Sequence, residues 1–194
     1  MSKESADRFE FTIIAGDLKG RRITAPKLGH TRPPLSRLRK SIFDFLNPHL
    51  VDVDYLDLFS GTGSYLFEAV SRGVRSALGV EMEPALAASI ERQAEKYHVA
   101  DRLRCRCEDV FAAIPRLHES GRSFDIVMVA PPQYQDLVDR TLECLQSNPV
   151  VAPSGLIICQ HDTVETKKIN FRNFVIDQQR KYGNTTFTVL RVTE

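Results

Sequence analysis

The residues best suited to chemistry lie in DLFSGTGS, residues 57–64, where an apolar segment runs into two closely spaced glycines. Gly61 and Gly63 permit a tight turn and let a ligand approach the backbone, because neither has a Cβ atom. A dinucleotide site has a third glycine three residues further on, but Leu66 occupies that position. The carboxylate of Asp57 would repel a pyrophosphate and attract an ammonium group. S-adenosylmethionine, which has an ammonium group and no phosphate, fits this loop better than a dinucleotide.

Two further acids follow at the ends of the next apolar segments. Glu81 ends ALGVE, where a carboxylate can accept both hydroxyls of a ribose. Asp109 follows CRCE, where it can accept the adenine amino group while the N–H of Val110 meets a ring nitrogen. Glu108 is the alternative candidate for the adenine contact. Each acid could instead cap a helix, and the loop could require its glycines only for the turn. Acids at successive segment ends favour a nucleoside site, and the predicted cofactor-binding residues are Asp57, Phe59, Ser60, Gly61, Thr62, Gly63, Glu81, Met82, Asp109 and Val110.

The elements that position these residues follow from the hydrophobic pattern. From about residue 53, short apolar runs alternate with helical patterns of about 10–15 residues, which predicts right-handed βαβ units and a parallel sheet. The predicted strands are 53–59, 75–81, 102–107, 124–130 and 155–161. The predicted helices between them are 64–72, 84–98, 109–120 and 137–146. Two strand-like runs around a Gly-Asn turn within residues 171–193 predict a terminal antiparallel hairpin.

The first 50 residues follow a different pattern. Residues 11–25 predict a short hairpin, residues 29–37 a proline-containing loop, and the residues after them a helix that ends at Asn47-Pro48. The predicted fold class is therefore α/β, a Rossmann-like and mostly parallel sheet with a C-terminal hairpin and a small N-terminal hairpin-and-helix extension. We predict two units, an extension over 1–50 and a catalytic domain over 51–194.

The charge is distributed unevenly. Residues 18–43 contain eight of the 26 lysine and arginine residues and no acidic residue, so the rest of the chain has 18 basic residues against 25 acidic ones. A basic stretch on an acidic body favours a polyanionic partner, most often nucleic acid. A solvated basic face without a partner is the alternative.

Other classes of protein are disfavoured. The polar start MSKESADRFE does not resemble a signal peptide, and no run approaches the roughly 18 apolar residues of a membrane span. The four cysteines form no C-x-x-C pair, so we expect reduced core thiols in a cytoplasmic protein. The five histidines lack metal-ligand spacing, and we expect them on the surface or in loops, with no metal bound.

Together these features resemble the class I S-adenosylmethionine-dependent methyltransferases, and more closely the RsmD family, which methylates N2 of a guanine in bacterial 16S ribosomal RNA. The resemblance runs along nearly the whole chain and rests on IIAGDLKGRRITAP, TRPPLSRLRKSIFDFL, DLFSGTGSYLFEAVSRG, APPQY and RKYGNT. It implies S-adenosylmethionine as the cofactor and ribosomal RNA, or the small ribosomal subunit, as the partner.

The resemblance also assigns a role to the two prolines after the fourth strand. In the family, Asp or Asn precedes the prolines and Tyr or Phe follows them. The acid or amide and a nearby carbonyl orient the amine of the base, and the aromatic ring stacks on the flipped base. This chain departs twice, since Ala130 replaces the acid or amide and Gln133 the aromatic residue. The implied catalytic segment is Ala130, Pro131, Pro132, Gln133 and Tyr134.

The basic segment is implied to bind RNA phosphates, which gives affinity without sequence information. Its candidates are Lys19, Arg21, Arg22, Arg32, Arg37, Arg39 and Lys40. Arg32 and Arg37 also match a family segment and could instead brace the cofactor loop. Tyr182 is a further candidate on the substrate side, with packing beside a turn as the alternative.

The expected function is methylation of the N2 amine of a guanine in small-subunit ribosomal RNA. The alternative is a catalytically silent RNA-binding protein that keeps the cofactor fold, suggested by Ala130 and Gln133. A nicotinamide-dependent oxidoreductase is disfavoured by Leu66 and the two prolines. We expect a monomer with neither a membrane nor a metal as a partner.

Overall fold

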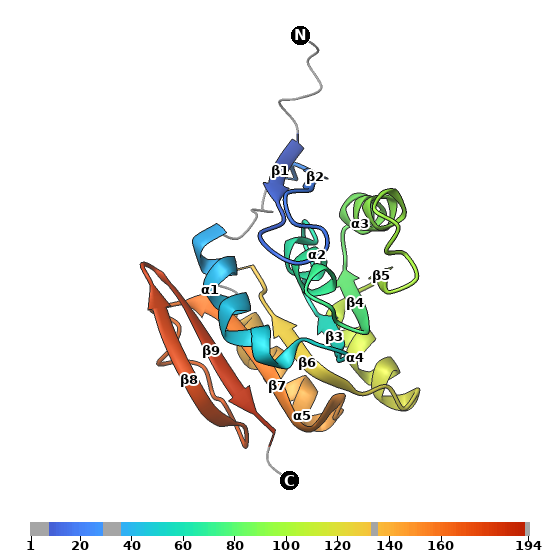
Figure 1. Cartoon of the computed structure of the whole chain (residues 1–194). Coiled ribbons are helices and arrows are strands. Elements are labelled where there is room, and N and C mark those ends of the chain that lie inside the picture. Colours follow the sequence, from blue (N-terminus) through green and yellow to red (C-terminus); the bar gives the residue numbers. More distant parts are fainter. Residues whose placement is uncertain (1–7, 29–35, 133–135, 193–194) are drawn as a thin grey trace.

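A seven-stranded sheet organises the computed structural model, which describes residues 8–28, 36–132 and 136–192. The strand order is β5-β4-β3-β6-β7-β9-β8 (Figure 1). The strands are β3 (Asp54–Asp57), β4 (Ser76–Glu81), β5 (Leu103–Cys107), β6 (Phe124–Val129), β7 (Val151–Asp162), β8 (Val175–Tyr182) and β9 (Thr185–Arg191). Strands β3 to β7 pair in parallel, whereas β9 pairs antiparallel with both β7 and β8. The predicted Rossmann-like sheet with a terminal hairpin is confirmed.

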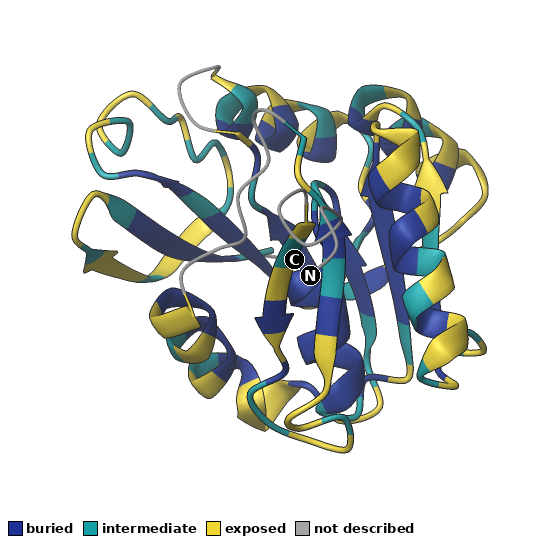
Figure 2. Ribbon diagram, turned by 90° about the horizontal axis from the view of Figure 1, so that it is seen from above, coloured by how far each residue is buried: buried dark blue, intermediate teal, exposed yellow. Residues whose placement is uncertain are grey.

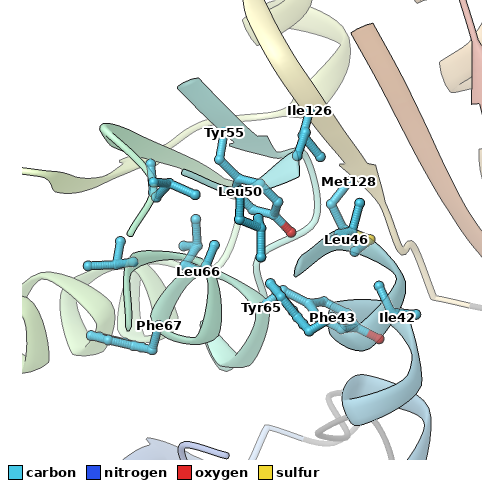
Figure 3. Packing of buried hydrophobic residues seen from close by; sticks show 14 of the residues in the cluster. Ile42, Phe43, Leu46, Leu50, Tyr55, Tyr65, Leu66, Phe67, Ile126 and Met128 are labelled. Carbon is cyan, nitrogen blue, oxygen red and sulfur yellow. The ribbon is translucent and has the colours of Figure 1, made fainter. Parts of the chain in front are cut away.

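Two layers of helices cover the sheet, because successive residues of a strand point to opposite faces. Tyr55 and Ile126 belong to the first apolar cluster, together with helices α1 to α3, and Figure 3 shows Phe43 and Tyr65 from α1 and α2 in this cluster. Leu56 belongs to the second cluster, with helices α4 and α5. Figure 2 shows buried strands between helices whose outer faces are exposed. The helices are α1 (Ser36–Leu46), followed by the short 3-10 helix η2 (Asn47–His49), then α2 (Ser64–Ser71), α3 (Pro84–Lys96), α4 (Val110–Glu119) and α5 (Leu137–Ser147).

The N-terminal hairpin differs in position from the prediction. It consists of β1 (Arg8–Thr12) and β2 (Arg22–Pro26), so the first strand ends where the apolar run 11–15 has barely begun. The reason is that the N–H groups of Ile14 and Ala15 are used elsewhere, as hydrogen-bond donors to the carboxylate of Glu68. A side chain 53 residues away thus determines where the strand ends.

Two side chains of α2 fasten this hairpin to the rest of the molecule. The fully buried Glu68 accepts hydrogen bonds from the N–H of Ile14 at 3.0 Å and of Ala15 at 3.2 Å. The hydroxyl of Ser71 donates to the carbonyl of Ala15 at 2.5 Å and accepts from the N–H of Leu18 at 2.9 Å. The tip of the hairpin therefore lies against the end of the helix that begins at the predicted cofactor loop.

Arg39 belongs to the same buried network, and the prediction that it contacts RNA is wrong. Its side chain is only 1% exposed, its Nη2 donates to the carbonyl of Thr12 at 2.5 Å, and its Nε lies 3.7 Å from Oε2 of Glu68. Arg72 pairs with the other oxygen of Glu68 at 2.9 Å. Burial lowers the pKa of Arg39, and the carboxylate of Glu68 opposes this effect. Position 39 faces inward because it lies on the same side of α1 as the buried Phe43, one turn further on.

We expect Glu68→Ala to lower the free energy of unfolding by about 3–5 kcal/mol, because it leaves two buried arginines without their carboxylate. Asp44→Ala is the matched control, since it removes only the exposed pair with Lys40 and should cost about 0.3–0.5 kcal/mol. Urea unfolding of the three proteins measures both values. Equal losses for the two variants would contradict the assignment of a central structural role to Glu68.

Candidate active site at the carboxyl edge of the sheet

Strand β3 passes into α2 through the glycine loop, residues 60–63. The N–H of Ser60 donates to a carbonyl of β4 at 3.0 Å, so the loop begins attached to the neighbouring strand. Gly61 and Gly63 have φ angles of 52° and 79°, in the left-handed region that glycine adopts without steric cost. A Cβ atom at Gly63 would lie 2.9 Å from Cγ1 of Ile90. The loop therefore needs glycine both for its turn and for its contact with α3.

Asp57 ends β3 directly before this loop and is fully buried. Its Oδ1 accepts the N–H of Phe59 at 3.3 Å, whereas Oδ2 has no hydrogen-bond partner among the described residues. Burial raises the pKa of Asp57 to about 7, and the nearby Glu81 adds to the rise, against the effect of the Phe59 N–H. A buried acceptor without a donor is costly unless a ligand satisfies it. The site thus fits the ammonium end of S-adenosylmethionine.

Glu81 lies at the end of the adjacent strand and is 9% exposed. Its Oε2 accepts the N–H of Gly61 at 2.6 Å and its Oε1 accepts the N–H of Glu83 at 2.9 Å. Burial raises the pKa of Glu81, and these backbone hydrogen bonds oppose the rise. Each oxygen keeps a further lone pair, which suits the two hydroxyls of a ribose. The adjacent Met82 is 66% exposed and offers an apolar surface to a flat ring.

Asp109 and its rival Glu108 are distinguished by their partners. Glu108 is engaged by arginines, with its Oε2 2.6 Å from Nη1 of Arg116. Oδ1 of Asp109 accepts the N–H of Phe111 at 2.8 Å and so caps α4, as the alternative interpretation expected, but its side chain has no arginine partner among the described residues. Asp109 is therefore the better candidate for an adenine contact, with the N–H of Val110 at the first position of the same helix.

Strand β6 ends beside this group of acids. Ala130 is half-buried and packs against the first apolar cluster, Pro131 is buried, and Pro132 is exposed. The predicted Gln133 and Tyr134 lie outside the described residues. The fold thus brings the predicted cofactor residues and the first part of the predicted catalytic segment to one edge of the sheet, while their contacts with a cofactor or substrate remain predictions.

Two tertiary hydrogen bonds at the same edge were not predicted. The hydroxyl of Tyr65 donates to Oε1 of Gln160, and the hydroxyls of Ser41 and Tyr182 share a hydrogen bond. Tyr182 also stacks on Phe187, with ring centroids 5.9 Å apart. The bonded residues are separated by 95 and 141 positions in the chain, so no local pattern could have indicated either pair.

The expectation that all five histidines lie on the surface or in loops is wrong for His161. His161 is not on the surface but 1% exposed in β7, with its Nε2 3.0 Å from the hydroxyl of Thr188. Burial lowers the pKa of His161.

The cysteines are free, but only Cys159 is fully buried, and Cys107 is exposed. In the part of the chain that the structure describes, no group of three metal-binding side chains occurs and no helix is long and apolar enough to cross a membrane.

The fold and the site together define a class of protein. A parallel sheet extended by an antiparallel strand, a glycine loop after its first strand and acids at the ends of the next strands are the features of the class I S-adenosylmethionine-dependent methyltransferases.

Comparison with known proteins gives the family. A family model described as conserved hypothetical protein 95 matches residues 11–191, and the chain belongs to this family, the RsmD family of S-adenosylmethionine-dependent methyltransferases. Ribosomal RNA small subunit methyltransferase D of Escherichia coli K12 is 28% identical over 178 residues, which cover 92% of this chain and 88% of that protein.

Solved structures share the fold of this chain. A hypothetical protein of Thermus thermophilus is similar with a TM-score of 0.79 and 26% identity, over 94% of this chain and 99% of the other. An RNA methyltransferase from Salinibacter ruber, solved in complex with S-adenosyl-L-homocysteine, has a TM-score of 0.64 and 17% identity, over 84% of this chain and 95% of the other. The second likeness shows the fold alone.

Asp57 should make cofactor binding depend on pH. Because its pKa is raised to about 7, the free protein holds a proton there at lower pH, and a bound ammonium group must displace that proton. We expect the affinity for S-adenosylmethionine to rise with pH up to about 7, and Asp57→Asn to bind weakly with no such rise. Calorimetry in two buffers of different ionisation enthalpy measures the released proton. An affinity of the unmodified protein that stays constant from about pH 5.5 to 8 would refute this role.

The same carboxyl group affects stability. The unfolded chain loses the Asp57 proton near the ordinary pKa of 3.8, whereas the folded chain keeps it up to about 7. The free energy of unfolding should therefore fall as the pH rises between these values and level off above them. In Asp57→Asn this contribution is absent, which unfolding at several pH values can check.

Proposed function

We propose that the chain transfers a methyl group from S-adenosylmethionine to the exocyclic N2 amine of a guanine in small-subunit ribosomal RNA. The observation that carries the proposal is the buried oxygen of Asp57, which has no partner among the described residues, at a glycine loop beside the segment 130–132. Membership of the RsmD family and the similarity to the Escherichia coli ribosomal RNA methyltransferase support this choice of substrate.

In this proposal different residues of the chain bind different parts of the cofactor. When bound, S-adenosylmethionine supplies a methyl group that its positively charged sulfur has already activated. Asp57 accepts from the ammonium end and Glu81 from the ribose. Asp109 and the N–H of Val110 contact the adenine. The buried position of the first two acids favours a ligand that brings its own hydrogen-bond donors.

In this proposal the two prolines after β6 position the substrate. Pro131 and Pro132 fix the backbone, so the carbonyl of Ala130 is held in one direction and can accept an N–H of the amine. Catalysis of this kind depends on orientation rather than on a strong acid or base. The missing side-chain acceptor at position 130 is the feature on which the alternative of a silent binding protein rests.

The basic residues would bind RNA some distance from this site. Lys19, Arg21 and Arg22 are exposed at the tip of the hairpin. The tip lies against Ser71 at the end of α2, and the carbonyl of Arg22 accepts the hydroxyl of Tyr97 just beyond α3. Both helices lead away from the carboxyl edge of the sheet. Eight residues of helix span about 12 Å, so these side chains would contact flanking RNA rather than the reacting base.

Two exposed basic residues of α1 complete this proposed surface. Arg37 lies one turn before Ser41 and hence near Tyr182, whereas Lys40 is paired with Asp44. Arg32 lies outside the described residues. We retain the division into an RNA-binding extension, 1–50, and a methyltransferase domain, 51–194, as part of the proposal. It describes a division of function, because residues of both units share the first apolar cluster. We propose further that the chain acts in the cytoplasm as a monomer.

The direct test is methyl transfer to small ribosomal subunits purified from cells that lack this modification. We expect labelled methyl groups to appear as N2-methylguanosine in digested RNA, identified by mass spectrometry. Gly61→Val should abolish both transfer and S-adenosylmethionine binding, because a branched side chain would occupy the cofactor loop at a left-handed position. Normal cofactor binding without any methylated guanosine would instead favour the silent binding protein.

We expect Arg21→Glu with Arg22→Glu to weaken RNA binding and to reduce its dependence on salt, while S-adenosylmethionine affinity stays unchanged. The slope of log K against log salt should become shallower by roughly 0.7–0.9 for each phosphate that is no longer neutralised. Filter binding at several salt concentrations measures this slope. Arg122→Glu is the control, because it reverses an exposed arginine whose guanidinium lies over the ring of Phe124, a member of the second apolar cluster, whereas the hairpin packs in the first. An equal effect of the control would count against an RNA surface on the hairpin.

A further inference from the structure

The register of the strands places a second side chain next to Ala130. Val129 of β6 pairs with Cys159 of β7, and both belong to the second apolar cluster. The residues that follow, Ala130 and Gln160, therefore point to the opposite face, toward α1 and α2. Ala130 packs against the first cluster, and Gln160 pairs with Phe187, a member of that cluster. Neighbouring strands are about 4.8 Å apart, so Gln160 is within reach of a group bound at Ala130.

The amide of Gln160 is held in a defined orientation. The hydroxyl of Tyr65, in the helix that follows the glycine loop, donates to its Oε1. Tyr65 is 4% exposed, and burial raises the pKa of its hydroxyl above the ordinary value, so this donor stays protonated. Among the described residues the amide has no other hydrogen-bond partner. A lone pair of Oε1 and the N–H groups of Nε2 are thus left for a ligand, and the side chain is half-buried rather than enclosed.

We propose that Gln160 supplies, from β7, the side-chain acceptor that position 130 lacks, and that it positions the exocyclic amine of the guanine together with the Ala130 carbonyl. The inference rests on the proposed function, because it names a further residue of the same site. Position 130 has no side-chain acceptor, and in this proposal the amide of Gln160 on the neighbouring strand takes the role that an amide on β6 would have.

The chemical consequence is a fixed direction of the nitrogen lone pair. The guanine amine has two N–H bonds, and acceptors at Gln160 and Ala130 can engage both, which leaves the lone pair facing the methyl group. In the transfer this lone pair forms the new N–C bond, the S–C bond breaks with both electrons going to sulfur, and one N–H proton leaves for water. An amide does not take up that proton, so Gln160 is a positioning residue in this scheme.

Gln160→Leu tests the proposal, because it keeps the size of the side chain and removes the acceptor. We expect kcat for methylation of small subunits to fall about 100-fold, with the S-adenosylmethionine Kd unchanged. The unfolding midpoint should fall modestly, because the buried hydroxyl of Tyr65 loses its acceptor. Adding Ala130→Asn to Gln160→Leu should recover at least tenfold of this loss, by returning an amide to β6. Gln146→Leu, an exposed glutamine of α5, is the matched control and should have unaltered kinetics. A loss in Gln160→Leu that Ala130→Asn does not recover overturns the proposal.

A second readout is independent of turnover. With S-adenosylhomocysteine present, NMR titration compares guanosine monophosphate with inosine monophosphate, which lacks the N2 amine. We expect the unmodified protein to prefer the guanine nucleotide, because its amine donates to two acceptors. Gln160→Leu should reduce this preference roughly fivefold, since it removes one neutral hydrogen bond and leaves the one to the Ala130 carbonyl. Equal binding by the unmodified protein, or an unchanged preference in Gln160→Leu, overturns the proposal. A preference that depends on Gln160, without methylation of small subunits, would support the role of Gln160 while the proposed function fails.

Discussion

Glu68 places a carboxylate where no solvent reaches it, between two arginines and two backbone N–H groups of the N-terminal segment. A buried charge is tolerated only when its surroundings compensate it, so all four partners must be in place at once. This requirement ends β1 at Thr12, turns Arg39 inward and attaches the hairpin to α2. Because α2 begins at the glycine loop, the same helix supports both the basic extension and the predicted cofactor site.

The candidate site relies on the same physical principle but leaves the compensation incomplete. Asp57 is as fully buried as Glu68, yet one of its oxygens has no donor among the described residues, and burial raises its pKa to about 7. Glu81, at the end of the next strand, is met by backbone N–H groups of the glycine loop and of the segment after β4. Glu68 is thus satisfied by the protein itself, whereas Asp57 is satisfied only in part, which is why we propose it as a cofactor-binding residue.

The substrate side illustrates what a parallel sheet allows. The carboxyl ends of β6 and β7 lie next to each other, so the amide of Gln160 and the backbone of Ala130 lie close together although they are 30 positions apart in the chain. Tyr65 links this surface to the helix of the cofactor loop through its hydrogen bond.

The sequence by itself determined the sheet and its helices, because these depend on hydrophobic periodicity, and it predicted the cofactor segments from glycines and acids at fixed local spacings. It could not separate the buried Arg39 from the exposed Lys40, its neighbour, or place His161 in the core, since each depends on distant partners. The pairing of Tyr65 with Gln160 likewise joins residues 95 positions apart. Only the tertiary structure decides such contacts, because burial and hydrogen bonding are set by neighbours in space and not along the chain.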